Sequence, residues 1–319
     1  MRVAIQLFGH VRSFRETYHF LKKYILDKHD CDLFIHTWST EEHTDITWHK
    51  GSSNSIGETN KDELKSLYKP RKINIEDNCT IEHRGLFNPQ KTMTLRAIKA
   101  MLYAQKQVNN LRLEYQEETN TEYEWVITLR PDVMPLTPLD LNDYKEEPEF
   151  ERNSSIHFAN GAHHHIQGTK IIYTPLASDL FFIAKPKVMT VLCSAIDEFE
   201  KFYQKFESVN RGGISAPEAS YLEYIHHQGV QPRFYTFPYI VKRTSGEHHL
   251  VVGLEYLSHF KHTVEIPSFV NLKQPSRLKS PMLAFLSVSS LNKLQKELKR
   301  FIRRLECWIN RIEQVKSDK

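Results

Sequence analysis

Residues 125–135 of the chain read WVITLRPDVMP, an apolar, β-branched run that stops abruptly at Arg130-Pro131-Asp132. A short apolar run bounded by turn residues is typical of a buried strand, and a proline cannot sit inside a central strand. Arg130 and Asp132 are therefore expected just beyond the carboxyl end of a strand, where open α/β sheets bind their ligands. A cation and a carboxylate there suit a phosphate group and its metal ion. The alternative is an ion pair that closes a surface turn.

The segments before this run alternate between strand and helix patterns. Strands are expected at residues 2–8, 32–37, 72–75 and 125–129, and helices at 13–26, 61–67 and 89–113. Ser13, with Glu16 three residues later, has capping-box spacing for the first helix. Strands that alternate with helices predict an α/β fold with a mostly parallel sheet flanked by helices.

The pattern changes after residue 135. Shorter strands are expected at 155–158, 170–173, 179–183 and 233–237, and helices at 186–206 and 217–227. Residues 161–168, which include three consecutive histidines from His163 to His165, are expected to form a flexible loop. We favour that loop over a zinc site, because consecutive side chains point in different directions and cannot easily ligate one ion. We expect one domain over residues 1–270 and a linker with a basic amphipathic helix over 271–319.

Composition is ordinary for a soluble globular protein of 319 residues, with 40% hydrophobic and 26% charged residues. The longest apolar runs are far shorter than the roughly 20 residues that cross a bilayer. Residues 3–8 are typical of a first strand rather than of a signal peptide. The four cysteines lack the paired spacing of a disulfide framework or a zinc motif. These features together predict a cytoplasmic protein.

The end of the chain carries an apolar seam at alternating three- and four-residue steps, with basic residues beside it: Leu291, Leu294, Leu298, Phe301, Leu305, Trp308, Ile312 and Val315. Three interpretations of residues 291–315 stay open: a coiled coil that forms a homodimer, a cationic helix lying on an anionic membrane surface, or a helix packed on the body. Net charge is +4, and the body is close to neutral without this segment. We therefore expect no nucleic-acid partner.

Further candidate residues follow other expected strands. Gly9 and Arg12 lie between the first strand and the first helix, where a glycine turn, backbone amides and an arginine can cradle a phosphate. The motif is neither GxGxxG nor a Walker A loop, and a plain strand-to-helix turn is the alternative. Asp179 opens an apolar strand, where a satisfied strand-end carboxylate is the simpler interpretation. Glu218 lies in the first turn of a helix, where an acidic side chain favours the macrodipole without any catalytic role.

The order of these segments resembles that of bacterial GT-A-type glycosyltransferases that build surface polysaccharide such as lipopolysaccharide or capsule. The resemblance spans about residues 1–240 and depends on VAIQLFGHVRSF, DLFIHTW, WVITLRPDV, SDLFFIAKP and PEASYLEYIHHQGV. It implies a GT-A-like catalytic domain that moves a sugar from a nucleotide-sugar donor to a glycan or lipid-linked acceptor. It also implies peripheral attachment to the inner face of the cell membrane.

In that family an Asp-x-Asp element at a strand end binds a divalent cation, Mn²⁺ or Mg²⁺, and the diphosphate of the donor. Here the matching position reads Arg130-Pro131-Asp132, so an arginine replaces the first aspartate. The resemblance implies Asp132 as a metal ligand, but Arg130 could itself neutralise the diphosphate, and metal dependence stays open.

By the same resemblance Gly9 and Arg12 would lie against the nucleotide. Asp179 would face the donor sugar or the acceptor, and Glu218 would be a candidate base near the acceptor. Two other functions stay open: a non-catalytic nucleotide- or glycan-binding module of the same fold, and a metal-dependent phosphohydrolase that uses the histidine-rich segment and Asp132.

Overall fold

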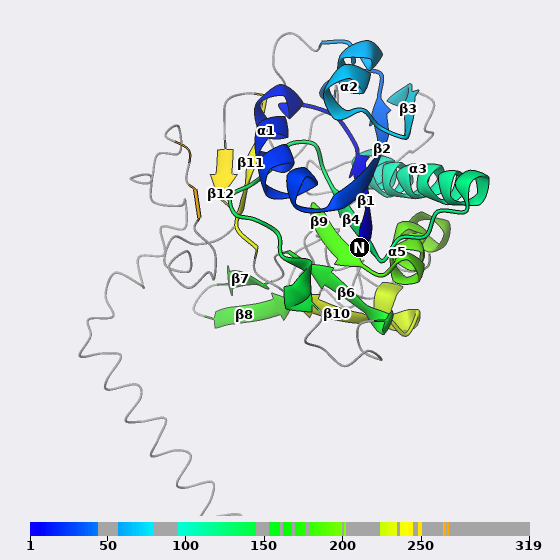
Figure 1. Ribbon diagram of the computed structural model, residues 1–319. Coiled ribbons are helices and arrows are strands. Elements are labelled where there is room, and N and C mark those ends of the chain that lie inside the picture. The colour runs from blue at the N-terminus through cyan, green and yellow to red at the C-terminus, as the bar shows by residue number, and fades with distance from the viewer. Residues whose placement is uncertain are drawn as a thin grey trace, which may run out of the picture. The chain divides into compact units, whose positions relative to one another are not determined.

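The computed structural model describes residues 1–43, 57–78, 95–144, 153–159, 162–167, 170–175, 179–199, 201, 224–234, 237–244, 248–250, 264–265 and 267. It confirms the predicted α/β class: a mostly parallel seven-stranded sheet has helices on its faces (Figure 1). The sheet order is β10-β6-β9-β4-β1-β2-β3. The strands are β1 (Arg2–Phe8), β2 (Asp30–Trp38), β3 (Lys72–Glu76), β4 (Trp125–Leu129), β6 (Ser155–Phe158), β9 (Phe181–Ala184) and β10 (Gln231–Phe234).

Strand β1 lies at the centre of this sheet, parallel to both β2 and β4. Beyond β2, strand β3 is also parallel. Beyond β4, strand β9 runs antiparallel to its neighbours β4 and β6, while β10 is parallel to β6. The chain therefore builds outward from β1 to β3 and then returns to the other side of β1 with β4. This reversal is the topological switch point, outside which open α/β sheets bind ligands at the carboxyl ends of their strands.

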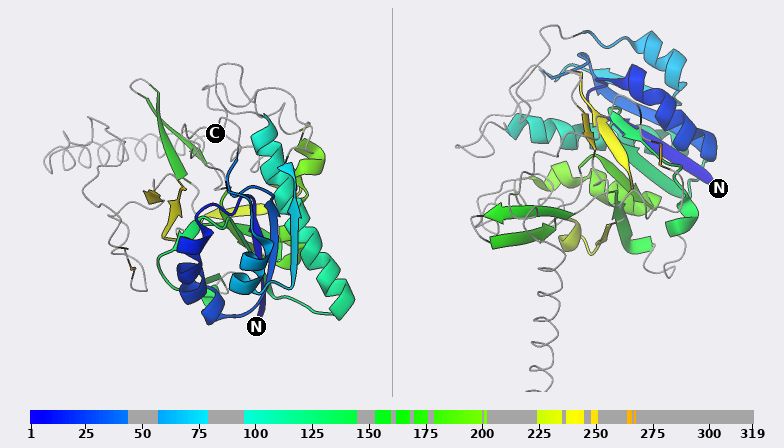
Figure 2. Two further views of the ribbon diagram at one scale, coloured as in Figure 1. Left: turned by 90° about the horizontal axis from the view of Figure 1, so that it is seen from above. Right: turned by 90° about the vertical axis from the view of Figure 1, so that its left-hand side faces the viewer.

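The two faces of the sheet follow from the alternation of side chains along a strand. Val3, Ile5 and Leu7 of β1 join the core cluster that contains residues of α1 and α2, whereas Ala4 and Phe8 join the cluster under α3 and α5. Figure 2 shows α1 and α3 on opposite sides of the strands. The helices are α1 (Phe14–Tyr24), α2 (Lys61–Tyr68), α3 (Leu95–Thr119) and α5 (Pro186–Cys193), with 3₁₀ turns at η1 (Leu26–Lys28), η3 (Leu141–Tyr144) and η4 (Ala195–Glu198).

The predicted capping box of α1 is wrong. Ser13 makes no side-chain cap, and its Oγ instead donates to the carbonyl oxygen of Lys242 at 2.7 Å. The carboxylate of Glu16 pairs with Nζ of the same Lys242 at 2.6 Å. Both side chains that the sequence assigned to the helix end therefore hold strand β11 (Tyr239–Lys242) against it.

Two smaller sheets were not expected from the sequence. Strand β11 pairs antiparallel with β5 (Val133–Pro135) and β12 (His248–Leu250). Strands β7 (Ala162–Gln167) and β8 (Lys170–Pro175) form an antiparallel hairpin. The predicted loop over residues 161–168 is therefore wrong, because all six residues of β7 pair with β8.

The helix predicted at residues 186–206 is interrupted rather than continuous, since Phe199 and Lys201 are again helical after a 3₁₀ turn. Helix α5 ends at Cys193, and η4 follows it directly. Ser194 donates its Oγ to the carbonyl of Thr190 at 2.9 Å, and its amide is shared between the carbonyls of Thr190 and Val191. Such back-bonding by serine competes with regular helix bonds, which explains the change to a 3₁₀ turn.

The chain divides into two compact units, Met1–Ile266 and Pro267–Lys319. The predicted amphipathic helix at 291–315 lies outside the described residues, and the predicted helix at 217–227 is described only over residues 224–227, which are helical. Among the described helices, none is both long and apolar enough to span a membrane.

Candidate functional site

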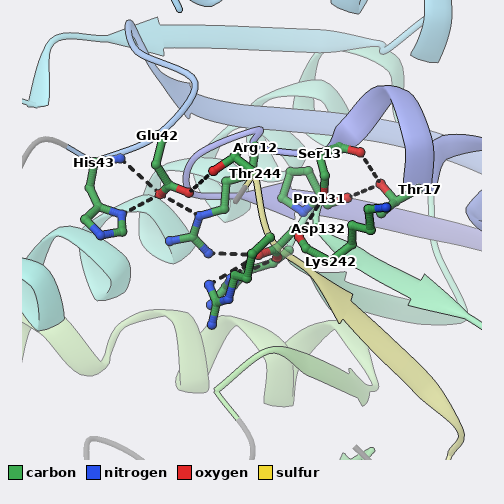
Figure 3. A network of polar contacts seen from close by, with 11 residues as sticks. Arg12, Ser13, Thr17, Glu42, His43, Pro131, Asp132, Lys242 and Thr244 are labelled. Atoms are coloured by element: carbon green, nitrogen blue, oxygen red, sulfur yellow. Dashed lines mark hydrogen bonds and ion pairs between the residues drawn. The ribbon is translucent and has the colours of Figure 1, made fainter. Parts of the chain in front are cut away.

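The loop after β1 and the loop after β4 meet at the switch point of the sheet. Arg12 follows β1, and its Nη1 donates to Oδ2 of Asp132 at 2.8 Å. The same guanidinium donates through Nε to Oε1 of Glu42 at 2.8 Å. Figure 3 shows Arg12 between these two carboxylates, with His43 against the carboxylate of Glu42. Arg12 and Asp132, which the sequence placed in the site separately, thus lie in one connected set of charges.

The backbone around Arg12 is bent by two residues in left-handed conformations. Gly9 has φ +85° and Arg12 has φ +48°. Glycine adopts this region freely, but a side chain such as that of Arg12 rarely does, and such strain persists only where surrounding bonds enforce it. The amide of Arg12 donates to the carbonyl of Glu41 at 2.9 Å, which supplies one such bond. Gly9 therefore shapes the turn, and Arg12 is held in a fixed direction.

Asp132 is fully buried, and three arginines surround its carboxylate. Arg130 donates from Nε to Oδ1 at 2.9 Å and from Nη2 to Oδ2. Arg243, which follows β11, has its Nη1 at 3.5 Å from Oδ2. Burial raises the pKa of the Asp132 carboxyl, and the charges of Arg12 and Arg243 oppose that rise. We call Arg12, Arg130 and Arg243 the arginine cluster.

Glu42 forms the second buried carboxylate of the site. Its Oε1 pairs with His43 and with Arg12, and its Oε2 accepts from Oγ1 of Thr244 at 3.2 Å. Burial opposes ionisation of Glu42, but the hydrogen bonds from His43 and the charge of Arg12 hold its pKa far below the ordinary value. Glu42 is therefore ionised at neutral pH and orients Arg12.

Asp179 lies two residues before β9, beside the loop that carries Arg130: the amide of Arg130 donates to the carbonyl of Leu180 at 3.1 Å. Burial raises the pKa of Asp179 to about 6, and the charge of Asp132 adds to the rise, whereas Arg243 and Arg12 oppose it. A carboxyl group that titrates close to neutral pH can take up a proton from a substrate, which is a property of functional sites.

His10 lies beside this set of charges in the loop after β1. Its Nδ1 donates to the carbonyl of Thr40 at 2.9 Å, because a carbonyl oxygen can only accept. Burial lowers the pKa of His10 to about 3, and the charge of Arg12 adds to this effect. His10 is therefore neutral over the physiological range and adds no charge to the site.

The structure brings together most of the predicted site residues, namely Gly9, Arg12, Arg130, Asp132 and Asp179. Glu218 lies outside the described residues.

Sequence reasoning missed Glu42 and Arg243. Arg243 had a usable signal, because it follows the apolar Ile240-Val241 as Arg130 follows the apolar run of β4. Glu42 had none, since it lies within a polar stretch, about residues 41–60, that is typical of a long loop.

A divalent cation does not fit the donors as they are placed. Within the ranges that the structure describes, no three His, Cys, Asp or Glu side chains gather closely enough to hold a metal ion. Both oxygens of Asp132 already accept from guanidinium groups. Mn²⁺ and Mg²⁺ require several oxygen ligands, and here arginines occupy the positions around the carboxylate.

No protein-family model and no curated protein matches the chain.

Proposed function

We propose that the protein is a GT-A-type glycosyltransferase that moves a sugar from a nucleotide-sugar donor to a hydroxyl of a growing surface glycan, such as lipopolysaccharide, O-antigen or capsule. One observation carries this proposal: the arginine cluster converges on the buried Asp132 at the switch point of the sheet. Guanidinium groups at that position suit the diphosphate of an activated sugar.

The proposed chemistry needs charge stabilisation on the leaving group and a base for the acceptor. As the bond between the anomeric carbon and the diphosphate oxygen breaks, its electron pair stays on the diphosphate, and the arginine cluster stabilises the growing negative charge. The acceptor oxygen forms the new bond to the anomeric carbon and gives up its proton. Asp179 is the candidate base among the described residues, since its raised pKa makes the carboxylate a better proton acceptor. Glu218 stays the other candidate.

The same proposal assigns a role to the basic segment at the end of the chain. A lipid-linked acceptor lies at a membrane surface, and the basic segment 291–315 would hold the enzyme at the inner face of the cell membrane. A homodimer through the same apolar seam is the alternative. Removal of residues 291–319, followed by membrane fractionation and measurement of the mass in solution, separates these two roles.

The proposal is tested with the purified full chain and a panel of nucleotide sugars. We expect one class of donor to raise the melting temperature, and transfer of its sugar to isolated glycan or lipid-linked acceptors to release the nucleoside diphosphate. Asp179→Asn should keep the thermal shift and lose turnover by about 100-fold or more. Asp197→Asn, at an exposed carboxylate paired with Lys106, is the matched control and should keep turnover.

Three results would contradict the proposal. If no nucleotide sugar stabilises the protein, the site does not bind an activated sugar. If simple phosphoesters release phosphate in the absence of any acceptor, the protein is a phosphohydrolase. Donor binding without turnover in any acceptor mixture would favour the non-catalytic binding module.

A further inference from the structure

We infer that the arginine cluster binds the diphosphate directly, without a divalent cation, and that Asp132 positions its guanidinium groups. The inference rests on the proposed function for the identity of the natural ligand. It assigns Arg243 as a ligand of the diphosphate and changes the role of Asp132 from metal ligand to positioning residue.

Asp132 is more deeply buried than the three arginines that contact it. The side chain of Asp132 is 0% exposed, whereas those of Arg12, Arg130 and Arg243 are 11%, 13% and 14% exposed. The arginines come from three separate segments, after β1, after β4 and after β11, and all three lie within ion-pair distance of the same Oδ2. The three arginine side chains are thus slightly exposed, and they converge on one fully buried carboxylate.

Three guanidinium groups lie close together at this position. Asp132 pairs with all three, and Glu42 pairs with Arg12 as well. Asp179 acts on Arg243 from nearby, and burial raises the pKa of its carboxyl to about 6. Crowding of like charges lowers the pKa of Arg243, after the larger effect of burial. A diphosphate brings negative charge to this point and forms charge-assisted bonds with guanidinium groups, so its binding offsets the repulsion among the three arginines.

A divalent cation at Asp132 would be repelled where a diphosphate is attracted. It would have to displace donors from both carboxylate oxygens and would then lie close to three positive charges. Guanidinium groups can instead supply what a metal ion supplies in phosphoryl and glycosyl chemistry, which is positive charge fixed next to the leaving oxygen.

A second buried carboxylate with two arginines lies at the other end of the parallel strands and serves as a comparison. Asp32 is also a buried carboxylate, 2% exposed, that accepts from Arg2 at 2.8 Å and from Arg71 at 2.5 Å. Here, however, the arginine side chains are 37% and 51% exposed, and the hydroxyl of Tyr123 adds a third bond at 2.9 Å. This site lies at the amino ends of the parallel strands, where no ligand is expected. Arg71→Gln is therefore the control for loss of an arginine from a buried carboxylate.

The test is calorimetric titration of the full chain with inorganic pyrophosphate in the presence of EDTA. We expect saturable binding without metal, weakened about tenfold or more by Arg243→Gln and unchanged by Arg71→Gln. Arg243→Lys keeps the charge but loses the planar fork, and it should restore binding only in part. Thermal unfolding of each variant shows whether it is folded at the titration temperature. Titration of the unaltered protein alone already tests whether pyrophosphate binds without metal.

Three results would overturn the inference: no binding of pyrophosphate in EDTA, full affinity in a folded Arg243→Gln protein, or binding of Mn²⁺ alone that Asp132→Asn abolishes. Failure of the proposed glycosyltransferase function gives a different set of results from failure of this inference. If pyrophosphate binds with the expected pattern but no nucleotide sugar is turned over, the anion site stands and the glycosyltransferase does not. If a donor is turned over only with Mn²⁺, the glycosyltransferase stands and the metal-free site does not.

Discussion

Arg12 is the side chain that connects the buried charges of the site. It lies 2.8 Å from both Glu42 and Asp132, and its backbone is held at φ +48°. A charged side chain in a strained conformation is kept only where several bonds enforce it, and such positions cluster at functional sites. The strain and the ion pairs therefore have one explanation: the guanidinium must point in one direction before any ligand arrives.

Arg12→Gln should lower the free energy of unfolding by about 3 kcal/mol, because it leaves part of the charge of two buried carboxylates uncompensated. Arg15→Gln is the control, three residues away. Arg15 pairs with Glu41 and Glu63, but its side chain is 48% exposed, and an exposed ion pair contributes at most about 1 kcal/mol. Urea unfolding of both variants measures the difference. Equal losses would mean that Arg12 is an ordinary surface arginine.

Asp179→Asn should change how stability depends on pH. In the folded protein the pKa of Asp179 is raised from 3.8 to about 6, so protonation stabilises the fold. That contribution is fully present below the ordinary pKa of aspartate and is lost as the pH rises through about 6. Asparagine cannot ionise, so the variant should gain stability relative to the unaltered protein over this window, by at most about 3 kcal/mol.

Chemical unfolding in steps from about pH 4 to about pH 7.5 measures this difference. Asp197→Asn, at an exposed carboxylate, should show no such window. A constant difference between the Asp179→Asn protein and the unaltered one would mean that Asp179 is ionised throughout and carries no raised pKa.

The site residues were predictable from sequence where a charged residue follows an apolar strand. Arg130, Asp132 and Asp179 all adjoin such runs, and local pattern was enough to place them at strand ends. Local pattern could not show that Glu42 and Arg243 complete the site, because their positions depend on how distant segments pack. The third arginine of the cluster is therefore a tertiary feature.

Among the elements, α1 contacts two of the three segments that carry arginines of the cluster. Ser13 donates to the carbonyl of Lys242, next to Arg243, and Oγ1 of Thr17 donates to the carbonyl of Pro131 at 2.5 Å, between Arg130 and Asp132. Both bonds come from the amino-terminal half of one helix. The helix therefore acts as the common support for loops that are far apart in the sequence.

Thr17→Val tests this support, because it keeps the shape of the side chain and removes the hydroxyl. The carbonyl of Pro131 would lose a buried hydrogen bond, which costs about 1 to 2 kcal/mol in stability. Pyrophosphate affinity should fall as well, since Arg130 and Asp132 lose their fixed position. Thr119→Val removes an exposed hydroxyl that donates to Tyr115 and should change neither quantity. Unchanged affinity for Thr17→Val would show that the loop is held without α1.

The elements of the central sheet also show where sequence reasoning succeeds. Strands β1 to β4 carry apolar runs between turn residues, and their positions were predicted within a few residues. Strands β5, β7 and β11 were not predicted: β5 has only three residues directly after the Arg130-Pro131-Asp132 turn, β7 is rich in histidine, and β11 has only a short apolar run. These strands form because a partner strand is beside them, which is a property of the tertiary structure.

At the scale of the whole molecule, Glu265 lies at the end of the first compact unit and is bonded to residues within it. The amide of Glu265 donates to the carbonyl of Leu136 at 2.8 Å, and its carboxylate pairs with Lys23 and with the hydroxyl of Tyr24. These contacts connect residue 265 to α1 and to the segment after β5. The first unit ends at Ile266 and contains the whole arginine cluster. Residues 267–319 form the second unit.

Two truncated chains test this boundary. A chain of residues 1–266 should unfold in urea with the same midpoint as the full chain and should bind pyrophosphate equally well, because the arginine cluster ends at Arg243. A chain of residues 1–263 lacks Glu265, so the carbonyl of Leu136 and the hydroxyl of Tyr24 lose their partner. Its stability should be lower by about 1 to 2 kcal/mol, the cost of an unmade hydrogen bond in a partly buried place. If the 1–266 chain does not fold, the second unit is part of the same cooperative structure. If the 1–263 chain is as stable as the 1–266 chain, the body ends before Glu265.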